Sequence, residues 1–182
     1  MLIQKFDIFS KAQAADCWQE INDLHFEQAT VKGNGQGVYD PHARRSGISS
    51  QVSGRVGAIL RSAEEVFRLN VAENLTLQGW QLLRYGVGDK FSPHQDAIKG
   101  ERNYERKYTV LVCFQAAIRG GGTRFVNTDR TENLTAGQML VWQNMTDAGD
   151  IIQDSLHEGC EVLEGVKMVA VAWFMMPNFD SG

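Results

Sequence analysis

YGVGDKFSPHQD, residues 85–96, is the stretch on which the interpretation of this chain depends, and HEGCEVLEGVK, residues 157–167, is its counterpart near the other end. In an extended segment, residues i and i+2 project to the same side, so one metal ion could bind both His94 and Asp96. His157 would then arrive from a distant strand. Two imidazoles and one carboxylate leave positions open on an octahedral ion, which is typical of non-haem iron sites.

Other interpretations of the triplet His94-Gln95-Asp96 stay open at this point. Zinc also binds two histidines and an acid. The absence of an HExxH segment argues against a metalloprotease. On its own an HxD triplet is a weak signal, and its interpretation depends on the residues that accompany it.

Lys167 is the second part of the pattern. It begins an apolar stretch in which Val169, Val171 and Trp173 alternate on the same side. A lysine that faces inward is costly unless it meets an anion, so its ammonium could hold the remote carboxylate of a diacid that chelates the metal. Alternatively, Lys167 caps the strand in solvent. Tyr85 could donate a phenolic hydrogen bond to the same carboxylate or serve as a core tyrosine.

Composition places the chain among soluble globular proteins. Its 182 residues are enough for one domain, 1–182, with a buried core. The formal charge of -4 gives no reason to expect nucleic acid as a partner. The three cysteines are widely spaced, which favours a reducing compartment, and no apolar run is long enough to span a membrane. We therefore expect a cytoplasmic protein with no membrane partner.

The pattern of apolar residues predicts α+β architecture. We expect an opening strand near residues 3–8, a helix over 11–24 with a Ser10–Gln13 capping box, and a second helix capped by Ser49 or Ser50. Strands follow at 78–87, 108–116, 123–127, 138–144 and 167–176. Helices first and then short strands favour a double-sheet jelly roll backed by helices, with mainly helical support over 1–74 and the core over 75–176.

Three loops are also expected. The glycine-rich residues 28–39 predict a mobile turn between strands. Residues 40–46 predict a solvated loop, although its Arg44 and Arg45 could meet an acidic substrate. Residues 97–107 would border the mouth of the site, either as a lid or as a solvated hairpin loop.

From about residue 82 to residue 173, the chain resembles the prolyl 4-hydroxylase branch of the 2-oxoglutarate- and iron(II)-dependent dioxygenases. The shared pattern includes a tyrosine nine residues before HxD, a GGxTxF turn, and a lysine ten residues after the distal histidine. The residues that match it are Tyr85, Phe91, His94, Asp96, Arg106, Thr109, Gly120, Gly121, Thr123, Phe125, 137–142, His157, Lys167 and Trp173. One departure is Glu161, which precedes Val162 where the family often has proline.

This resemblance implies a double-stranded β-helix, also called a jelly roll. It implies that His94, Asp96, His157 and Lys167 are the catalytic residues. Iron(II) would bind the first three, and Lys167 with Tyr85 would bind 2-oxoglutarate. The other implied reactant is O2, with ascorbate as a reductant, and the expected reaction hydroxylates a substrate with release of succinate and CO2.

The resemblance also implies a class of substrate. The branch that demethylates nucleic acid uses arginine as its anchor, so Lys167 favours a protein or peptide residue, proline first. Hydroxylation of a free amino acid or other small molecule is the alternative, as is a non-catalytic metal-binding sensing module. Phe91, Arg106 and Trp173 are candidates for the substrate side of the pocket, although each could instead serve the core.

Overall fold

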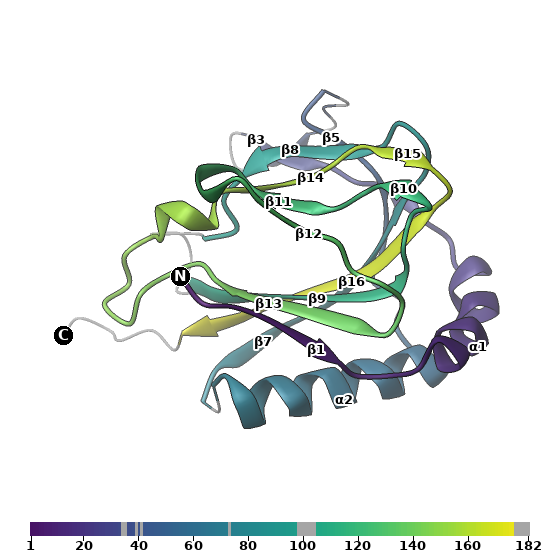
Figure 1. Ribbon diagram of the computed structural model, residues 1–182, viewed down its shortest axis with the longest axis horizontal. Helices are drawn as coiled ribbons and strands as arrows, with labels where there is room; N and C mark the ends of the chain where they lie inside the picture. The colour runs from purple at the N-terminus through teal and green to yellow at the C-terminus, as the bar shows by residue number, and fades with distance from the viewer. Residues whose placement is uncertain (34–35, 39, 41, 73, 98–104, 177–182) are drawn as a thin grey trace.

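Two β-sheets face each other, and two helices cover the outer side of the larger sheet (Figure 1). The computed structural model describes residues 1–33, 36–38, 40, 42–72, 74–97 and 105–176. All strand pairs among the described residues are antiparallel, and most of them join segments that are distant in the sequence. This is the predicted jelly roll with helices on one side.

The larger sheet forms the floor of the molecule in Figure 1 and carries the longest strands. Within the described residues it has seven strands, and five of them match predicted strands closely. In sheet order they are β1 (Ile3–Asp7), β13 (Gln138–Gln143), β9 (Glu105–Gln115), β16 (Lys167–Met176), β7 (Thr76–Tyr85), β6 (Gly47–Ser49) and β2 (Glu27–Gln28).

The smaller sheet forms the opposite layer, and its strands are short. In sheet order, the five strands among the described residues are β12 (Arg130–Glu132), β11 (Thr123–Phe125), β14 (His157–Gly159), β8 (Lys90–His94) and β5 (Arg44–Arg45). Two further pairs join β10 (Arg119–Gly120) to β15 (Val162–Glu164) and β3 (Val31–Gly33) to β4 (Gln36–Val38), and the 3-10 turns are η1 (Val126–Thr128) and η2 (Gln153–Ser155).

The central strands of the larger sheet are apolar on both faces because both faces are covered. Val110, Val112 and Ala170 pack towards the helices. Leu111 and Val169, which alternate with them, pack into the space between the sheets. The two cores are therefore separate, and only the one between the sheets adjoins the site.

The helices α1 (Lys11–Asn22) and α2 (Gly54–Asn70) pack against the outer face. The predicted capping box is confirmed, since Ser10 and Gln13 bond each other's backbone N–H. The predicted cap of α2 is wrong: Ser53 occupies the N-cap without a side-chain hydrogen bond, because Ser49 belongs to β6. Neither helix, nor any other among the described residues, is long and apolar enough to cross a membrane.

The connection from β1 to α1 is fixed by a close backbone approach at Gly137. Its carbonyl accepts hydrogen bonds from the N–H groups of Ile8 and Phe9. A Cβ at position 137 would lie 2.0 Å from the carbonyl oxygen of Phe9, and the backbone φ is +95°, so only glycine fits here. This contact joins the amino-terminal strand to the start of β13.

The first 74 residues supply more than helical support, because they also give β1, β2 and β6 to the larger sheet and β5 to the smaller one. The loop predicted over 40–46 is wrong at its end, where Arg44 and Arg45 pair with Phe91 and Lys90 of β8. The glycine-rich turn falls mainly on residues 34–35, and the lid mainly on 98–104, which lie outside the described residues.

Candidate metal centre

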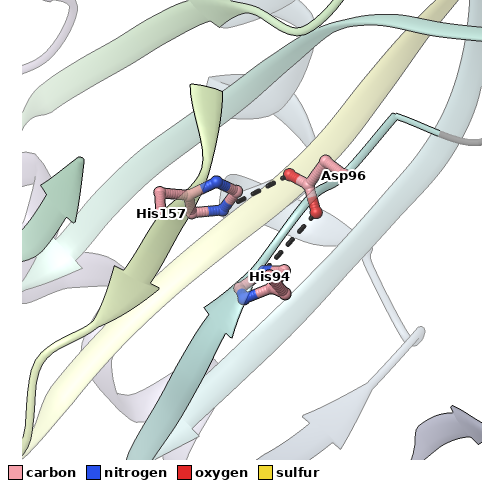
Figure 2. Close-up of side chains that lie close together, drawn as sticks. All are labelled: His94, Asp96 and His157. Carbon is pink, nitrogen blue, oxygen red and sulfur yellow. Dashed lines mark ion pairs between the residues drawn. The ribbon is translucent and has the colours of Figure 1, made fainter. Parts of the chain in front are cut away.

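His94, Asp96 and His157 meet in the space between the two sheets (Figure 2). His94 ends β8, His157 begins β14, and the two residues pair directly in the antiparallel register of these strands. The Nε2 atoms of His94 and His157 lie 3.6 and 3.7 Å from the carboxylate oxygens of Asp96. Neighbouring ligands at roughly 2.1 Å from an octahedral ion lie about 3 Å apart, so the three groups are already near ligand spacing.

Both imidazoles are oriented in the same way. His94 Nδ1 lies 2.9 Å from the backbone oxygen of Ser92, and His157 Nδ1 lies 2.8 Å from that of Ser155. A carbonyl can only accept, so each Nδ1 is the protonated nitrogen and each Nε2 presents its lone pair to the centre. These two bonds fix the tautomer that a metal requires.

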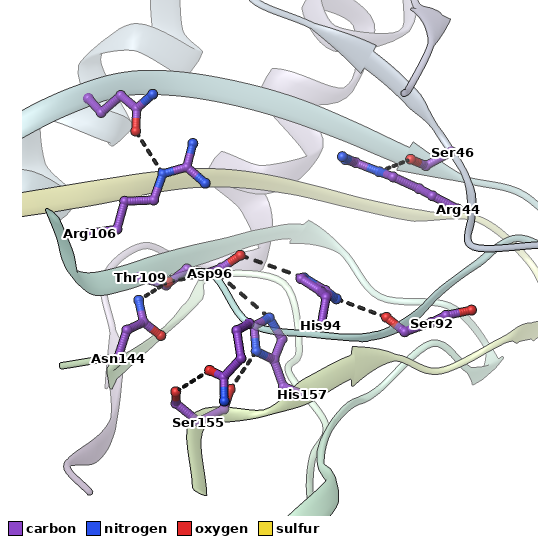
Figure 3. Close-up of polar contacts among 12 residues, drawn as sticks. Arg44, Ser46, Ser92, His94, Asp96, Arg106, Thr109, Asn144, Ser155 and His157 are labelled. Carbon is purple, nitrogen blue, oxygen red and sulfur yellow. Dashed lines mark hydrogen bonds and ion pairs between the residues drawn. The ribbon is translucent and has the colours of Figure 1, made fainter. Parts of the chain in front are cut away.

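The carboxylate of Asp96 is held by a buried relay (Figure 3). The Thr109 hydroxyl donates to Asp96 Oδ2 over 2.7 Å, and the Asn144 amide donates to Thr109 Oγ1 over 2.8 Å. Burial raises the pKa of Asp96, but the nearby imidazoles of His157 and His94 and the Thr109 hydroxyl outweigh it, so the pKa lies below its usual value. The carboxylate is therefore held ionised and in one orientation.

Aromatic rings enclose the imidazoles. Phe91 stacks on His94 with ring centroids 3.6 Å apart, and Trp142 meets His157 edge-on at 4.8 Å. Burial is the largest cause that lowers the pKa of His94, to about 4, with the charge of His157 adding to it. At neutral pH His94 is an uncharged ligand, which is the form that binds metal.

Lys167 lines the same cavity as the three groups. This cavity has a volume of about 70 Å³, and Tyr85, Thr123 and Lys167 line it together with the triad. A second cavity of about 430 Å³ adjoins it and shares Lys167, Leu111 and Thr123. The prediction of an inward-facing lysine is confirmed, since Lys167 is 9% exposed.

The surroundings of Lys167 fit an anionic ligand. No hydrogen bond or ion pair to its ammonium occurs among the described residues, and its nearest aromatic neighbour is Tyr85, with Nζ 5.4 Å from the ring centroid. Burial lowers the pKa of Lys167 to about 8. A buried ammonium without a counter-charge is costly, which favours a ligand that brings a carboxylate.

A family model described as the 2OG-Fe(II) oxygenase superfamily matches residues 80–175, more than half of the chain. The chain belongs to this superfamily. The match spans the two sheets, from β7 to β16, with all three metal-site residues and Lys167. Family and site together support iron(II) and 2-oxoglutarate as cofactor and cosubstrate.

Curated relatives of this oxygenase include prolyl 4-hydroxylases. Subunit alpha-1 from Caenorhabditis elegans is 29% identical over 178 residues, covering 92% of this chain and 31% of the relative. Human subunit alpha-3 is 29% identical over 100 residues, covering 51% of this chain and 18% of the relative. The oxygenase thus spans less than a third of the length of these relatives. The predicted resemblance to the prolyl 4-hydroxylase branch is confirmed.

Solved structures show the same fold. A viral collagen prolyl hydroxylase from Paramecium Bursaria Chlorella virus-1, in its 2OG complex, superposes with a TM-score of 0.76 at 17% identity and covers 96% of both chains. A Pseudomonas putida prolyl-4-hydroxylase superposes with a TM-score of 0.68 at 12% identity, covering 97% of this chain and 93% of that one. The predicted double-stranded β-helix is confirmed.

The residues expected on the substrate side of the oxygenase site lie around its mouth. Phe91 and Trp173 line the cavity of the triad. Arg106 lies over the Trp173 ring, with Cζ 3.7 Å from the centroid, and its Nε donates to Gln78 Oε1 over 2.8 Å. The structure thus places Phe91 and Trp173 in the cavity wall and Arg106 behind Trp173, and their role towards a substrate stays a prediction.

Arg44 was predicted to lie in a solvated loop where it could meet an acidic substrate, whereas the structure places it at the site. It lines the cavity with His94 and Asp96, and its guanidinium lies over Phe91, with Cζ 4.6 Å from the ring centroid. The signal was present in the sequence as the polar segment 40–46, but only the pairing of β5 with β8 shows that Arg44 faces the site. The roles of Asn144, Ser92 and Ser155 were missed. That of Asn144 depends on a contact between distant strands. Ser92 and Ser155 act through backbone oxygens two residues before each histidine, which residue type does not reveal.

Proposed function

We propose that this oxygenase hydroxylates a residue of a protein or peptide, proline first, and converts 2-oxoglutarate to succinate and CO2. The observation that carries the proposal is the unpaired ammonium of Lys167, which lines the same cavity as His94, Asp96 and His157. A diacid that chelates the metal with one end can reach Lys167 with the other. The prolyl 4-hydroxylases among the relatives support proline as the first residue to test.

The residues of the chain contribute position and protection from water. His94, Asp96 and His157 would hold iron(II), which with 2-oxoglutarate supplies the activation of O2 needed for hydroxylation. Lys167 neutralises the remote carboxylate and fixes the direction of the diacid in the cavity. The relay through Thr109 keeps Asp96 turned towards the two imidazoles.

The apolar wall also contributes. Leu83, Leu111 and Val169 line the cavity between the triad and Lys167. Such a wall excludes water, so the charge of Lys167 acts on the diacid with little screening. Trp142 adds an indole Nε1 that is buried without a hydrogen-bond partner among the described residues, and it is a free donor for a bound oxygen.

The decisive experiment is turnover of 2-oxoglutarate. Purified protein with iron(II), O2 and ascorbate as the proposed reductant should release succinate, and proline-containing peptides should raise the rate. His94→Ala should abolish release, whereas His25→Ala, at an exposed histidine beyond α1, should leave it unchanged. Absence of succinate release together with absence of iron binding would overturn the proposal. If no proline-containing peptide raised the rate of succinate release, a protein or peptide substrate would be excluded.

A further inference from the structure

Two arginines lie near the metal site: Arg44 lines its cavity, and Arg106 lies over the ring of Trp173, which also lines it. Figure 3 shows the guanidinium groups of Arg44 and Arg106 pointing towards each other above His94 and Asp96. Arg44 comes from β5 of the smaller sheet and Arg106 from β9 of the larger one. The pair is thus built by both layers of the jelly roll.

Each guanidinium is held in place by an aromatic ring and a polar neighbour. Arg44 lies over Phe91 and donates from Nε to Ser46 Oγ over 3.1 Å. Arg106 lies over Trp173 and donates from Nε to Gln78 Oε1 over 2.8 Å. Stacking on a ring and a bond at Nε fix the plane of each guanidinium, and a fixed guanidinium plane suits a carboxylate. The Arg44 side chain also contacts the Tyr85 hydroxyl.

Neither guanidinium has an ion pair with a carboxylate within the described part of the chain. Other basic side chains close to the site differ, since Arg45 pairs with Asp89 and Lys107 with Asp147. Both site arginines are partly buried. Burial lowers the pKa of Arg106, and the charge of Asp96 opposes this only in part. Burial of a cation without a counter-charge is costly, so a bound anion would stabilise both guanidinium groups.

The cofactor and cosubstrate do not supply that anion. Iron(II) contributes two positive charges and Lys167 one, while Asp96 contributes one negative charge and 2-oxoglutarate two. With both histidines neutral, the loaded centre has no net charge, and the two arginines stay uncompensated. The chain as a whole carries a formal charge of -4, so the pair is a local feature and not part of a basic surface.

We infer that the substrate brings a carboxylate to the mouth of the site, between Arg44 and Arg106, close to the carbon that is hydroxylated. This inference rests on the proposed function and narrows its substrate class. The carboxylate belongs either to an acidic side chain next to the target residue of a peptide or to the free carboxyl group of a small substrate. A charge-assisted bidentate contact discriminates strongly between a carboxylate and the amide of the same shape.

The experiment compares peptides that differ only in charge. Proline peptides with Asp, Asn or Lys beside the proline are titrated anaerobically into protein that holds iron(II) and 2-oxoglutarate, and binding is followed by fluorescence. We expect the Asp peptide to bind at least about tenfold more tightly than the Asn peptide, which is the effect of one charge-assisted contact. Equal binding of the Asp and Asn peptides, together with equal binding of free proline and its amide, would overturn the inference.

Variants locate the effect. The Asp-to-Asn affinity ratio is measured within each variant, so that a general loss of affinity cancels. Arg44→Gln and Arg106→Gln should bring the ratio close to one, Arg106→Lys should keep a preference for Asp, and Arg45→Gln, on the same strand but paired outside the site, should keep the full ratio. An unchanged ratio in both Gln variants would show that the arginines are not responsible and would overturn the inference.

Two further arms separate the alternatives. Binding of free proline and of its amide shows whether the carboxylate comes from a peptide or from a small substrate. If the protein binds proline more tightly than the amide but binds the peptides equally well, the carboxylate belongs to a small substrate. Succinate release in the absence of any substrate reports on the proposed function itself. Release of succinate with no charge preference overturns the carboxylate inference alone, whereas no release and no binding of 2-oxoglutarate overturns the proposed function.

Discussion

Lys167 and Tyr85 face each other across the antiparallel pair of β16 and β7, where they are direct partners in the register. The Lys167 ammonium lies 5.4 Å from the centre of the Tyr85 ring, and both side chains line the cavity of the metal site. The strand that ends in Tyr85 leads on to His94, and the strand that begins with Lys167 follows His157 in sequence. The register of these two strands therefore sets the distance between metal and anchor.

Lys167→Met should weaken binding of 2-oxoglutarate about a hundredfold or more. The substitution removes the buried ammonium that the proposed function pairs with the remote carboxylate, and it leaves that carboxylate without this counter-charge. Anaerobic titration of iron(II)-loaded protein, followed by the metal-to-ligand charge-transfer absorbance, measures the Kd. Lys107→Met is the matched control, because Lys107 pairs with Asp147 away from the cavity. An unaltered Kd in Lys167→Met would remove this residue as the anchor.

The affinity for 2-oxoglutarate should fall as the pH rises above the pKa of Lys167. Burial lowers the pKa of Lys167 to about 8 before the anion binds. Below that pH the ammonium is already present, so affinity is level. Above it, binding must take up a proton, so affinity falls by up to tenfold per pH unit. The pKa of Tyr85 is raised by burial, so the phenol keeps its proton over this range.

The control for this pH dependence is Lys167→Met, whose weak binding should not change between pH 7 and pH 9. Calorimetry adds an independent check, because the number of protons taken up on binding should rise across the same range in the native chain only. If the variant lost affinity with the same slope, another group would be responsible.

The sequence predicted the ligands because their chemistry is local. His94 and Asp96 are two residues apart, and Lys167 lies ten residues after His157. The triplet is a weak signal alone, and the resemblance to a family with the same spacings gave the pattern its meaning. Long strands such as β9 and β16 were also predictable, since apolar residues fill both faces over many positions. The direct pairing of His94 with His157 was not, because it depends on how two short strands meet.

Arg44 shows why other features escaped prediction. β5 has two residues, too few for any periodic pattern, and its position is set by pairing with Phe91 far along the chain. The N-cap of α2 was also mispredicted, because tertiary contacts decide which residue occupies it. Serines occupy positions 49, 50 and 53, and the choice among them follows from the pairing of Ser49 with Leu82 in the larger sheet. Local propensity allows each of these serines, and tertiary contacts select one.

Thr109→Val should weaken metal binding about 10- to 100-fold with little change in shape. The hydroxyl of Thr109 donates to Asp96 and accepts from Asn144, so valine frees the carboxylate to rotate. Titration with iron(II) under anaerobic conditions measures the Kd. Thr131→Val, at an exposed position of β12, is the control. Equal affinities in the two variants would show that the relay does not orient the ligand.

Phe67→Ala should lower the free energy of unfolding by about 3–5 kcal/mol, because it opens a cavity between α2 and the larger sheet. Phe67 is fully buried and stacks on Phe174 of β16, with ring centroids 3.8 Å apart. Leu69→Ala is the control on the same helix, since Leu69 is 81% exposed and should change stability by less than about 0.5 kcal/mol. Urea unfolding followed by circular dichroism measures both. Similar losses for the two variants would mean that α2 does not support the strands that carry Thr109 and Lys167.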